Sequence, residues 1–332
     1  MGPVYGIGNP LLDTLVYGTH DFLRSIDVKP GTMNLVDVDM QKQIVAAGRV
    51  ADAQPGGSSA NAMRVYAWLA EGHHTSPIYT GAVGGDASGR EFAGLLDAAG
   101  VQSRLATVDA STGGSIIYIT PDKERTMFTA LGACLLLKPE HIDEDALQRC
   151  SRVHLTGYVW DAPSGQEAAL KAIGAGNRRG IPVSFDVSDV LVADRHRSDF
   201  FDVLAGSLDV LFANESELAS LSEREDIDEM IERCRGLAGC LVIKRGAEGC
   251  RIVEATAVTD VPGEAVDVVD TSGAGDTFAG AFLYAREDGF TTLQAAQFAN
   301  FVASRVVRVI GCDTGAFDRD EIRSRKTSIR VA

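Results

Sequence analysis

Short apolar, β-branched runs alternate with longer stretches of helical periodicity through most of the chain. One run covers residues 77–83, and in the stretch 89–100 that follows it, Phe92, Leu95 and Leu96 recur at helical spacing. The alternation returns at residues 152–157 and 166–176, at 182–186, at 210–213 and 215–221, and at 240–243. Repeated strand, helix, strand units favour a parallel sheet covered on both faces, with ligand sites at the carboxyl ends of its strands. We therefore predict an α/β fold with a central, mostly parallel sheet flanked by helices.

Two segments, residues 13–53 and 101–131, interrupt this alternation. They contain short β-like runs with few helical signals between the first strands, and the runs are Leu11–Tyr17, Met33–Val38, Gly114–Thr120 and Thr126–Leu131. We interpret these segments as a small β-sheet lid. The main α/β domain would then comprise residues 1–12, 54–100 and 132–332, and residues 323–332 are expected to form a basic, frayed tail.

The charge and cysteine content exclude several classes of protein. With 31 Lys and Arg against 46 Asp and Glu, the net charge is −15, the wrong sign for binding nucleic acid or anionic lipid. The N-terminal residues carry no basic region or long apolar stretch, so we expect a cytoplasmic protein without a secretory signal. Six scattered cysteines without a C-x-x-C pair favour free thiols. The histidines show no metal-binding spacing, and His73, His74 and His196 are predicted to be surface or loop residues.

The most informative of the 35 glycines lie in the string at residues 268–282. We expect an apolar strand to end at Val269 and a helix to begin in the turn Gly273–Gly275, because aromatic and apolar residues then recur at helical spacing. Exposed amide hydrogens and the helix dipole make such a turn an anion site. Asp276 would stay ionised there and could accept a proton from a hydroxyl beside the anion. The alternative is that Asp276 only caps the helix.

The string Asp270–Asp276 matches the D-T-x-G-A-G-D signature of the ribokinase-like (PfkB) family of sugar and nucleoside kinases, which the chain resembles over essentially its whole length. The resemblance implies a single ribokinase-like kinase over residues 1–332. It also implies that Asp276 is the base that deprotonates the acceptor hydroxyl. The backbone amides of Gly273, Ala274 and Gly275 would then stabilise the phosphoryl group transferred from ATP.

The same resemblance assigns an acceptor site near the N-terminus. Gly56, Gly57 and Asn61 match the family's G-G-x-x-x-N substrate element, although locally they also fit a glycine turn with serine caps. Asn9 and Asp13 lie in a string that resembles the start of adenosine kinases, where they would sit under the ribose. A carboxylate suits this position because its two oxygens can accept from two neighbouring hydroxyls. A Rossmann fingerprint is disfavoured, since the string lacks the third glycine.

A nucleotide site is implied further along the chain. Asn214 and Glu217 match the family's N-x-x-E motif, which organises Mg²⁺ and the ATP phosphates through oxygen ligands, but they also fit a helix capping box. Lys244 stands where many family members have threonine. The remaining residues assigned to ATP by resemblance are Gly246, Gly249 and Asn300. Any ATP site is not of the P-loop type, since no G-x-x-x-x-G-K-[ST] string occurs.

Arg125 lies in an E-R-T string that is similar to one in the adenosine kinase branch, where the arginine contacts the transferring phosphate. A guanidinium offers paired donors that suit phosphoryl oxygens, although locally the string also fits a charged hairpin turn. We therefore predict ATP-dependent phosphorylation of a primary hydroxyl on a ribosyl nucleoside, with Mg²⁺ and with K⁺ as a further candidate. The alternatives are a sugar kinase for ribose, fructose or a related carbohydrate, and a catalytically silent nucleotide or nucleoside sensor. Both a monomer and a homodimer remain open.

Overall fold

The computed structural model describes the chain except residues 1, 72–74, 123 and 332, so His73, His74 and Lys123 lie outside the described residues. Its largest sheet has the strand order β16-β15-β14-β13-β12-β11-β1-β5-β7 within this described part. These strands are β1 (Val4–Ile7), β5 (Ile78–Thr80), β7 (Gln102–Ser103), β11 (Arg152–Thr156), β12 (Val183–Asp186), β13 (Leu208–Asn214), β14 (Ala238–Lys244), β15 (Cys250–Val253) and β16 (Val258–Val261). Neighbouring strands run parallel from β7 to β14, whereas β15 and β16 are antiparallel.

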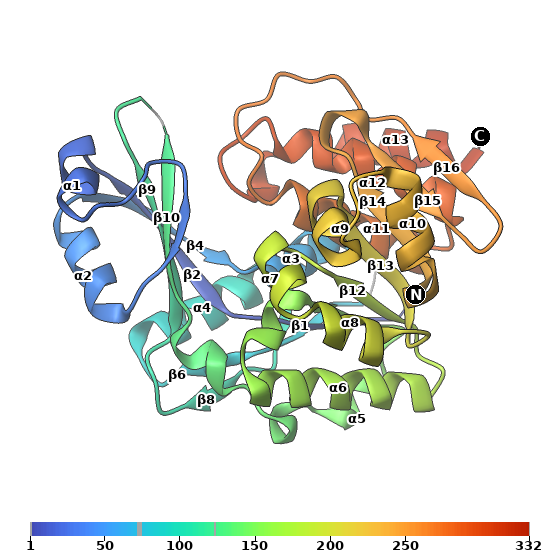
Figure 1. The fold of residues 1–332 in the computed structure, drawn as a ribbon, viewed down its shortest axis with the longest axis horizontal. Helices are drawn as coiled ribbons and strands as arrows, with labels where there is room; N and C mark the ends of the chain where they lie inside the picture. The colour runs from blue at the N-terminus through green and yellow to red at the C-terminus, as the bar shows by residue number, and fades with distance from the viewer. Residues whose placement is uncertain (1, 72–74, 123, 332) are drawn as a thin grey trace.

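Helices cover both faces of this sheet (Figure 1). One face packs against α3 (Ser58–Leu69), α4 (Ala87–Ala98), α11 (Ala274–Glu287), α12 (Thr292–Val306) and α13 (Arg319–Val331). The other packs against α5 (Glu144–Leu147), α6 (Pro163–Arg178), α7 (Val190–Arg195), α8 (Arg197–Leu204), α9 (Glu215–Ser222) and α10 (Ile227–Cys234). Alternate residues of one strand enter opposite cores, as Phe212 and Leu211 of β13 do. The predicted α/β class and mostly parallel sheet are confirmed.

A second, smaller sheet stands to the left in Figure 1, with strand order β3-β10-β9-β2-β4. Its strands are β2 (Leu11–Tyr17), β3 (Met33–Leu35), β4 (Arg49–Gly56), β9 (Gly113–Ile119) and β10 (Arg125–Ala130). The helices α1 (His20–Ser25) and α2 (Val38–Ala46) cover one face, where Tyr118 and Phe128 pack in a small core. Because side chains alternate along a strand, Ile117 and Met127 face the opposite side. The sheet therefore has one covered face and one face that borders a cavity.

The small sheet differs from the sequence prediction in two respects. The stretch 101–112 does not belong to it, because β7 joins the edge of the large sheet and β8 (Ala106–Val108) pairs with β6 (Ala82–Gly84). Two- and three-residue strands carry no sequence signal for the sheet they join. The expectation of few helical signals was also wrong, since Thr19 and Asp37 cap α1 and α2. Helices of six and nine residues are too short for periodicity to be seen reliably.

Three further expectations were wrong. The run 77–83 is divided at Gly81, where a side chain would lie 2.7 Å from the carbonyl oxygen of Gly8. Val269 does not end a strand, because its amide donates to the carbonyl of Val307 and the segment forms a loop. Residues 323–331 are not a frayed tail but part of α13, which is anchored by the buried side chains of Ile322 and Ile329.

All six cysteines are free and buried, as the sequence predicts. Within the described part of the chain, no helix is both long enough and apolar enough to span a bilayer.

Candidate active site

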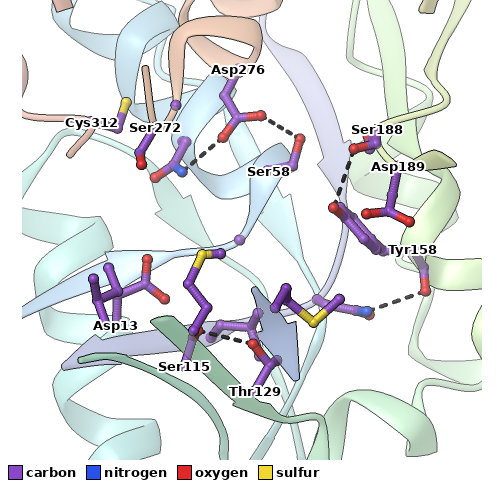
Figure 2. Close-up of a pocket in the computed structure, with 18 of the residues that line it drawn as sticks. Asp13, Ser58, Ser115, Thr129, Tyr158, Ser188, Asp189, Ser272, Asp276 and Cys312 are labelled. Atoms are coloured by element: carbon purple, nitrogen blue, oxygen red, sulfur yellow. Dashed lines mark hydrogen bonds between the residues drawn. The ribbon is translucent and has the colours of Figure 1, made fainter. Parts of the chain in front are cut away.

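A cavity of about 540 Å³ lies between the uncovered face of the small sheet and the large sheet with its flanking helices (Figure 2). This volume is in the range of small-molecule sites. Several residues predicted from the sequence line it together, although they come from distant parts of the chain: Asn9, Asp13, Gly57, Asn61, Arg125, Gly273 and Asp276.

Asp276 lies in the first turn of α11, and Gly273 occupies the N-cap position with φ +73°. The two carboxylate oxygens are held by α3: Ser58 Oγ donates to Oδ1 at 2.6 Å and Asn61 Nδ2 donates to Oδ2 at 2.9 Å (Figure 2). No side-chain hydrogen bond caps α11 among the described residues. The Asp276 carboxylate therefore does not cap its own helix. Ser58 and Asn61 hold it at the wall of the cavity.

Burial is the largest influence on the pKa of Asp276 and raises it, while the hydrogen bonds from Ser58 and Asn61 lower it. A raised pKa makes this carboxylate a better proton acceptor than an exposed aspartate. Asp13 lies across the cavity, and its pKa is raised to about 7 by burial and by the charge of Asp276, while Arg64 lowers it. The cavity thus contains two partly buried carboxylates, and the charge of Asp276 raises the pKa of Asp13.

Gly56 and Gly57 bring the end of β4 against the N-terminal segment. Gly57 has φ +89°, and a Cβ there would lie 2.2 Å from the carbonyl oxygen of Asn9. A Cβ on Gly56 would lie 2.2 Å from the Asp13 carboxylate. Asn9 itself donates to the carbonyl oxygen of Tyr158 at 3.2 Å. The glycines are required for close approach in this wall.

Arg125, at the start of β10, reaches from the small sheet to the loop before α11. Its guanidinium forms an ion pair with Asp270 and donates to Ser272 Oγ at 3.4 Å. Burial raises the pKa of Asp270, but hydrogen bonds from the Gly311 amide, Arg125 and Ser272 outweigh it and keep that pKa low. The positive charge of Arg125 is therefore placed beside the glycine turn, not in a solvated hairpin.

A second polar group lies at the carboxyl ends of β12, β13 and β14. Lys244 Nζ donates to both oxygens of Asp186, at 2.8 and 3.0 Å. A Cβ on Gly275 would lie 3.3 Å from that Nζ, so the ammonium borders the glycine turn. Burial raises the pKa of Glu217 to about 7, although Lys244 lowers it. Lys244 stands where many family members have threonine, and here it forms an ion pair with Asp186.

A family model described as pfkB family carbohydrate kinase matches residues 28–318. The chain belongs to this family. An ATP-dependent ribose-1-phosphate kinase of Halopiger xanaduensis is 31% identical over 83% of this chain and 85% of its own. The adenosine kinase structure from Sinorhizobium meliloti is 29% identical with a TM-score of 0.87, and a probable sugar kinase structure from Rhizobium etli is 28% identical with 0.88. Both alignments cover 99% of this chain and of the other.

This PfkB protein is therefore a nucleoside or sugar kinase, a phosphotransferase with an alcohol acceptor. Kinases of the family use ATP and a divalent metal ion. The predicted family resemblance and enzyme class are confirmed.

Asn214 and Glu217 hold each other in place at the start of α9. They form a reciprocal capping box for α9, in which the Asn214 backbone and side-chain amides donate to the Glu217 carboxylate at 2.9 and 2.7 Å. Each Glu217 carboxylate oxygen accepts one of these bonds and keeps a further lone pair, which could face a metal ion or a metal-bound water while the cap stays intact. The described residues contain no group of three or more His, Cys, Asp or Glu that could hold an ion.

None of the residues assigned to ATP lines the cavity, and three of them belong to the turn after β14 or its surroundings. Gly246 and Gly249 have φ +56° and +93° in the turn between β14 and β15, and a Cβ on Gly249 would lie 2.2 Å from the carbonyl oxygen of Val261. Asn300 uses its side-chain amide to donate to the carbonyls of Val261 and Pro262, both at 3.1 Å. In this structure the three residues fix one turn and its neighbouring strand.

Several cavity residues were missed from the sequence. Ser58 precedes Asn61 and Arg64 follows it, each at a spacing of three on α3, which is the signal that could have found them. Asp186, which does not line the cavity but binds Lys244, was also missed, although it ends a predicted strand, where ligand sites are expected. The wall opposite the small sheet also contributes Tyr158, Asp161, Ser188, Asp189 and Arg195. His196 is not simply a surface residue, because its Nε2 lies 3.1 Å from Asp161 Oδ1 and its side chain is 19% exposed.

The Lys244–Asp186 pair gives a stability prediction for this PfkB kinase. In Lys244→Met, Asp186, with 2% of its side chain exposed, loses its ionic partner. We expect the free energy of unfolding in urea to fall by about 3–5 kcal/mol, since an unpaired buried charge is costly. The double variant Lys244→Met with Asp186→Asn should recover a large part of the loss. A Lys244→Met protein within about 0.5 kcal/mol of the wild type would contradict this account of the pair.

Proposed function

We propose that this kinase transfers the terminal phosphoryl group of ATP to the primary hydroxyl of a ribosyl nucleoside, with adenosine as the first candidate. The observation that carries the proposal is the position of Asp276. This carboxylate is held by two donors from α3 and lies in the first turn of a helix that a glycine opens, where it lines a cavity large enough for a nucleoside. A base beside an anion site is the arrangement that phosphoryl transfer to a hydroxyl requires.

In the proposed step, the acceptor hydroxyl loses its proton to the Asp276 carboxylate while its oxygen forms the bond to phosphorus. The bond from phosphorus to the bridging oxygen of ATP breaks, and ADP leaves. The amides of Gly273, Ala274 and Gly275 and the Arg125 guanidinium stabilise the charge on the transferring group. Lys244 adds a positive charge beside the same turn. Closure of the small sheet as a lid would keep water from the phosphoryl group.

When Mg²⁺ is bound with ATP, it neutralises charge on the phosphate oxygens. The chain would hold it through water near Asn214 and Glu217, while the capping box keeps both side chains in place. A response to K⁺ is a further prediction, tested by adding and omitting K⁺ in the assay. The cytoplasmic location also stays a prediction.

The composition of the cavity wall favours a nucleoside over a free sugar. The small sheet contributes the apolar side chains of Leu15, Met33, Leu35, Ile117 and Met127. Met33 and Leu35 are 41% and 59% exposed, so a ligand that covers them would remove considerable apolar surface from water. A flat heterocyclic base gains from this contact, whereas a sugar with a hydroxyl on nearly every carbon gains little.

The second candidate, a sugar or sugar phosphate as acceptor, is favoured by the opposite wall. Asp161, Asp189 and Arg195 line that side of the cavity, and the Arg195 guanidinium donates to Asp161 at 2.7 Å. Carboxylates can bind sugar hydroxyls, and an arginine can bind a phosphate. The ribose-1-phosphate kinase relative makes this alternative worth a direct comparison.

A panel of acceptors with ATP and Mg²⁺ tests the proposal: adenosine, inosine, guanosine, ribose, fructose and ribose 1-phosphate. We expect adenosine or another nucleoside to have the highest kcat/KM. In Met127→Gln, the KM for the nucleoside should rise about tenfold because apolar contact is lost, while any KM for ribose should stay unchanged. Activity on sugars alone would overturn the nucleoside assignment, and binding of nucleoside without ADP formation would support the sensor alternative.

A further inference from the structure

The side chain of Arg64 is connected to the candidate base through Asn61. Arg64 Nη1 donates to Asn61 Oδ1 at 3.2 Å, and Asn61 Nδ2 donates to Asp276 Oδ2 at 2.9 Å. We propose that Arg64 is a positioning residue, which fixes the Asn61 side-chain amide so that its nitrogen faces Asp276. This inference rests on the proposed function, because it assigns Arg64 a role in orienting the base of that reaction.

The three residues form one row along α3. Ser58, Asn61 and Arg64 follow one another at a spacing of three, and all line the cavity. Ser58 and Asn61 each hold a different oxygen of the Asp276 carboxylate. Arg64 is anchored by a second bond from the same Nη1 to the carbonyl oxygen of Pro55 at 3.0 Å, at the end of β4. Arg64 and Asn61 therefore connect a fixed backbone carbonyl to the carboxylate through three hydrogen bonds.

The chemistry of the carboxamide explains why an arginine is useful in this place. An asparagine side chain has a donor end and an acceptor end of nearly the same shape. If the Asn61 amide were rotated by half a turn, its oxygen would face the Asp276 carboxylate and its NH₂ group would face the Arg64 guanidinium. Both contacts would be repulsive, so Arg64 leaves only the orientation in which Asn61 donates to the base.

Arg64 also differs from an arginine that only stabilises the fold. Its Nε is buried and has no hydrogen-bond partner among the residues that the structure describes. Buried donors of structural arginines are normally satisfied. Arg64 is also close enough to Asp13 to lower the pKa of that carboxyl. Arg64 also lines the cavity, so its guanidinium lies beside the site where the acceptor would bind.

The hydrogen bond from Asn61 determines in which direction the pKa of Asp276 should shift. A donor to a carboxylate stabilises its charged form, so the Asn61 bond lowers the pKa of Asp276 against the effect of burial. Loss of the bond should raise that pKa. The other titratable or charged groups that interact with Asp276 are Asp13 of β2, Tyr158 after β11, Asp186 of β12, Lys244 of β14 and Cys312 after α12. A substitution that removes the Arg64 charge also removes its lowering effect on the pKa of Asp13 and Cys312, whereas Arg64→Lys keeps that charge.

The test compares Arg64→Met, Arg64→Lys, Asn61→Ala and the double variant Arg64→Met with Asn61→Ala. In the pH profile of kcat, Arg64→Met should raise the apparent pKa of the acidic limb by about half a unit to one unit. Arg64→Lys keeps a charged donor and should restore much of the wild-type profile. The double variant should match Asn61→Ala alone, because Arg64 acts through Asn61. The proposal would be overturned if the apparent pKa of this limb in Arg64→Met equals that of the wild type, or if the two single shifts add fully in the double variant.

A second readout does not depend on activity. The ¹³C signal of the Asp276 carboxyl carbon, assigned by its absence in Asp276→Asn, is titrated in the wild type and in each variant. The same upward shift of the Asp276 pKa is expected in Arg64→Met, and an unchanged titration would overturn the proposal even if no acceptor in the panel is phosphorylated. Inactivity of the wild type would instead contradict the proposed function alone. If Arg64→Met does not fold, Arg64→Leu replaces it, since leucine likewise has no donor for Asn61.

Discussion

Replacing Asp276 with asparagine should lower kcat by about 10²- to 10⁴-fold, because the acceptor hydroxyl loses its proton acceptor. The fold should be retained. Asparagine has almost the same shape, and its amide oxygen can still accept from Ser58 or Asn61. Since burial raises the pKa of Asp276, the neutral side chain removes a charge that is costly to bury, so Tm should be unchanged or slightly higher. Steady-state kinetics and thermal unfolding measure the two effects.

A matched control for this substitution is Asp313→Asn. Asp313 caps a short helical turn by accepting from the Gly315 amide at 2.8 Å and does not line the cavity. Asparagine also caps helices well, so kcat should stay within about twofold of the wild type. Near-normal turnover by Asp276→Asn, with the control behaving as expected, would remove Asp276 from the role of base.

Arg125→Met should lower kcat by about 10²- to 10³-fold, which is typical for loss of one group that stabilises transition-state charge. The structure places this guanidinium beside the glycine turn, paired with Asp270. The substitution leaves Asp270 its bonds from the amides of Ser272 and Gly311, at 3.0 and 2.7 Å. The turn should therefore keep its shape. Arg125→Lys should recover part of kcat, because it restores the charge but not the paired donors.

The control for Arg125 comes from the same small sheet. Arg24 in α1 is largely exposed and, within the described ranges, forms its ion pair with Asp21 alone, so Arg24→Met should leave both kcat and KM unchanged. If Arg125→Met stays within about threefold of the wild-type kcat, the arginine does not act on the transferring group, and its pairing with Asp270 serves only to dock the small sheet.

The parts of the fold that could be predicted are those whose signal is local. Strand and helix alternation showed the large sheet, and the glycine string located the N-terminus of α11. The segment before it could not be assigned in this way. Val268 and Val269 look like a strand, yet they are exposed in a loop, because the backbone there bonds to the end of α12 instead of to a strand. Apolar content alone does not show which backbone partner a segment will find.

Several residues of the candidate site were predicted from the sequence, but the hydrogen bonds and ion pairs between them were not. Asp276, Asn61 and Arg125 were named from the sequence, but the bonds among the elements that carry them join residues far apart in the chain. Ser58 and Asp276, for example, are separated by 218 positions. The pairing of Arg125 with Asp270 and of Lys244 with Asp186 likewise depends on which strands and loops meet in space. A single sequence carries no information on such pairs until the tertiary arrangement is known.

The central claim is that Asp276 promotes transfer of a phosphoryl group from ATP to the primary hydroxyl of a nucleoside. The most direct measurement is ³¹P NMR of reactions containing ATP, Mg²⁺ and adenosine, with wild-type and Asp276→Asn protein at equal concentration. The wild type should produce ADP and a nucleoside 5′-monophosphate in equal amounts, and the variant should produce neither in the same time. Equal product formation by both proteins, or ADP without a phosphorylated nucleoside, would contradict the account.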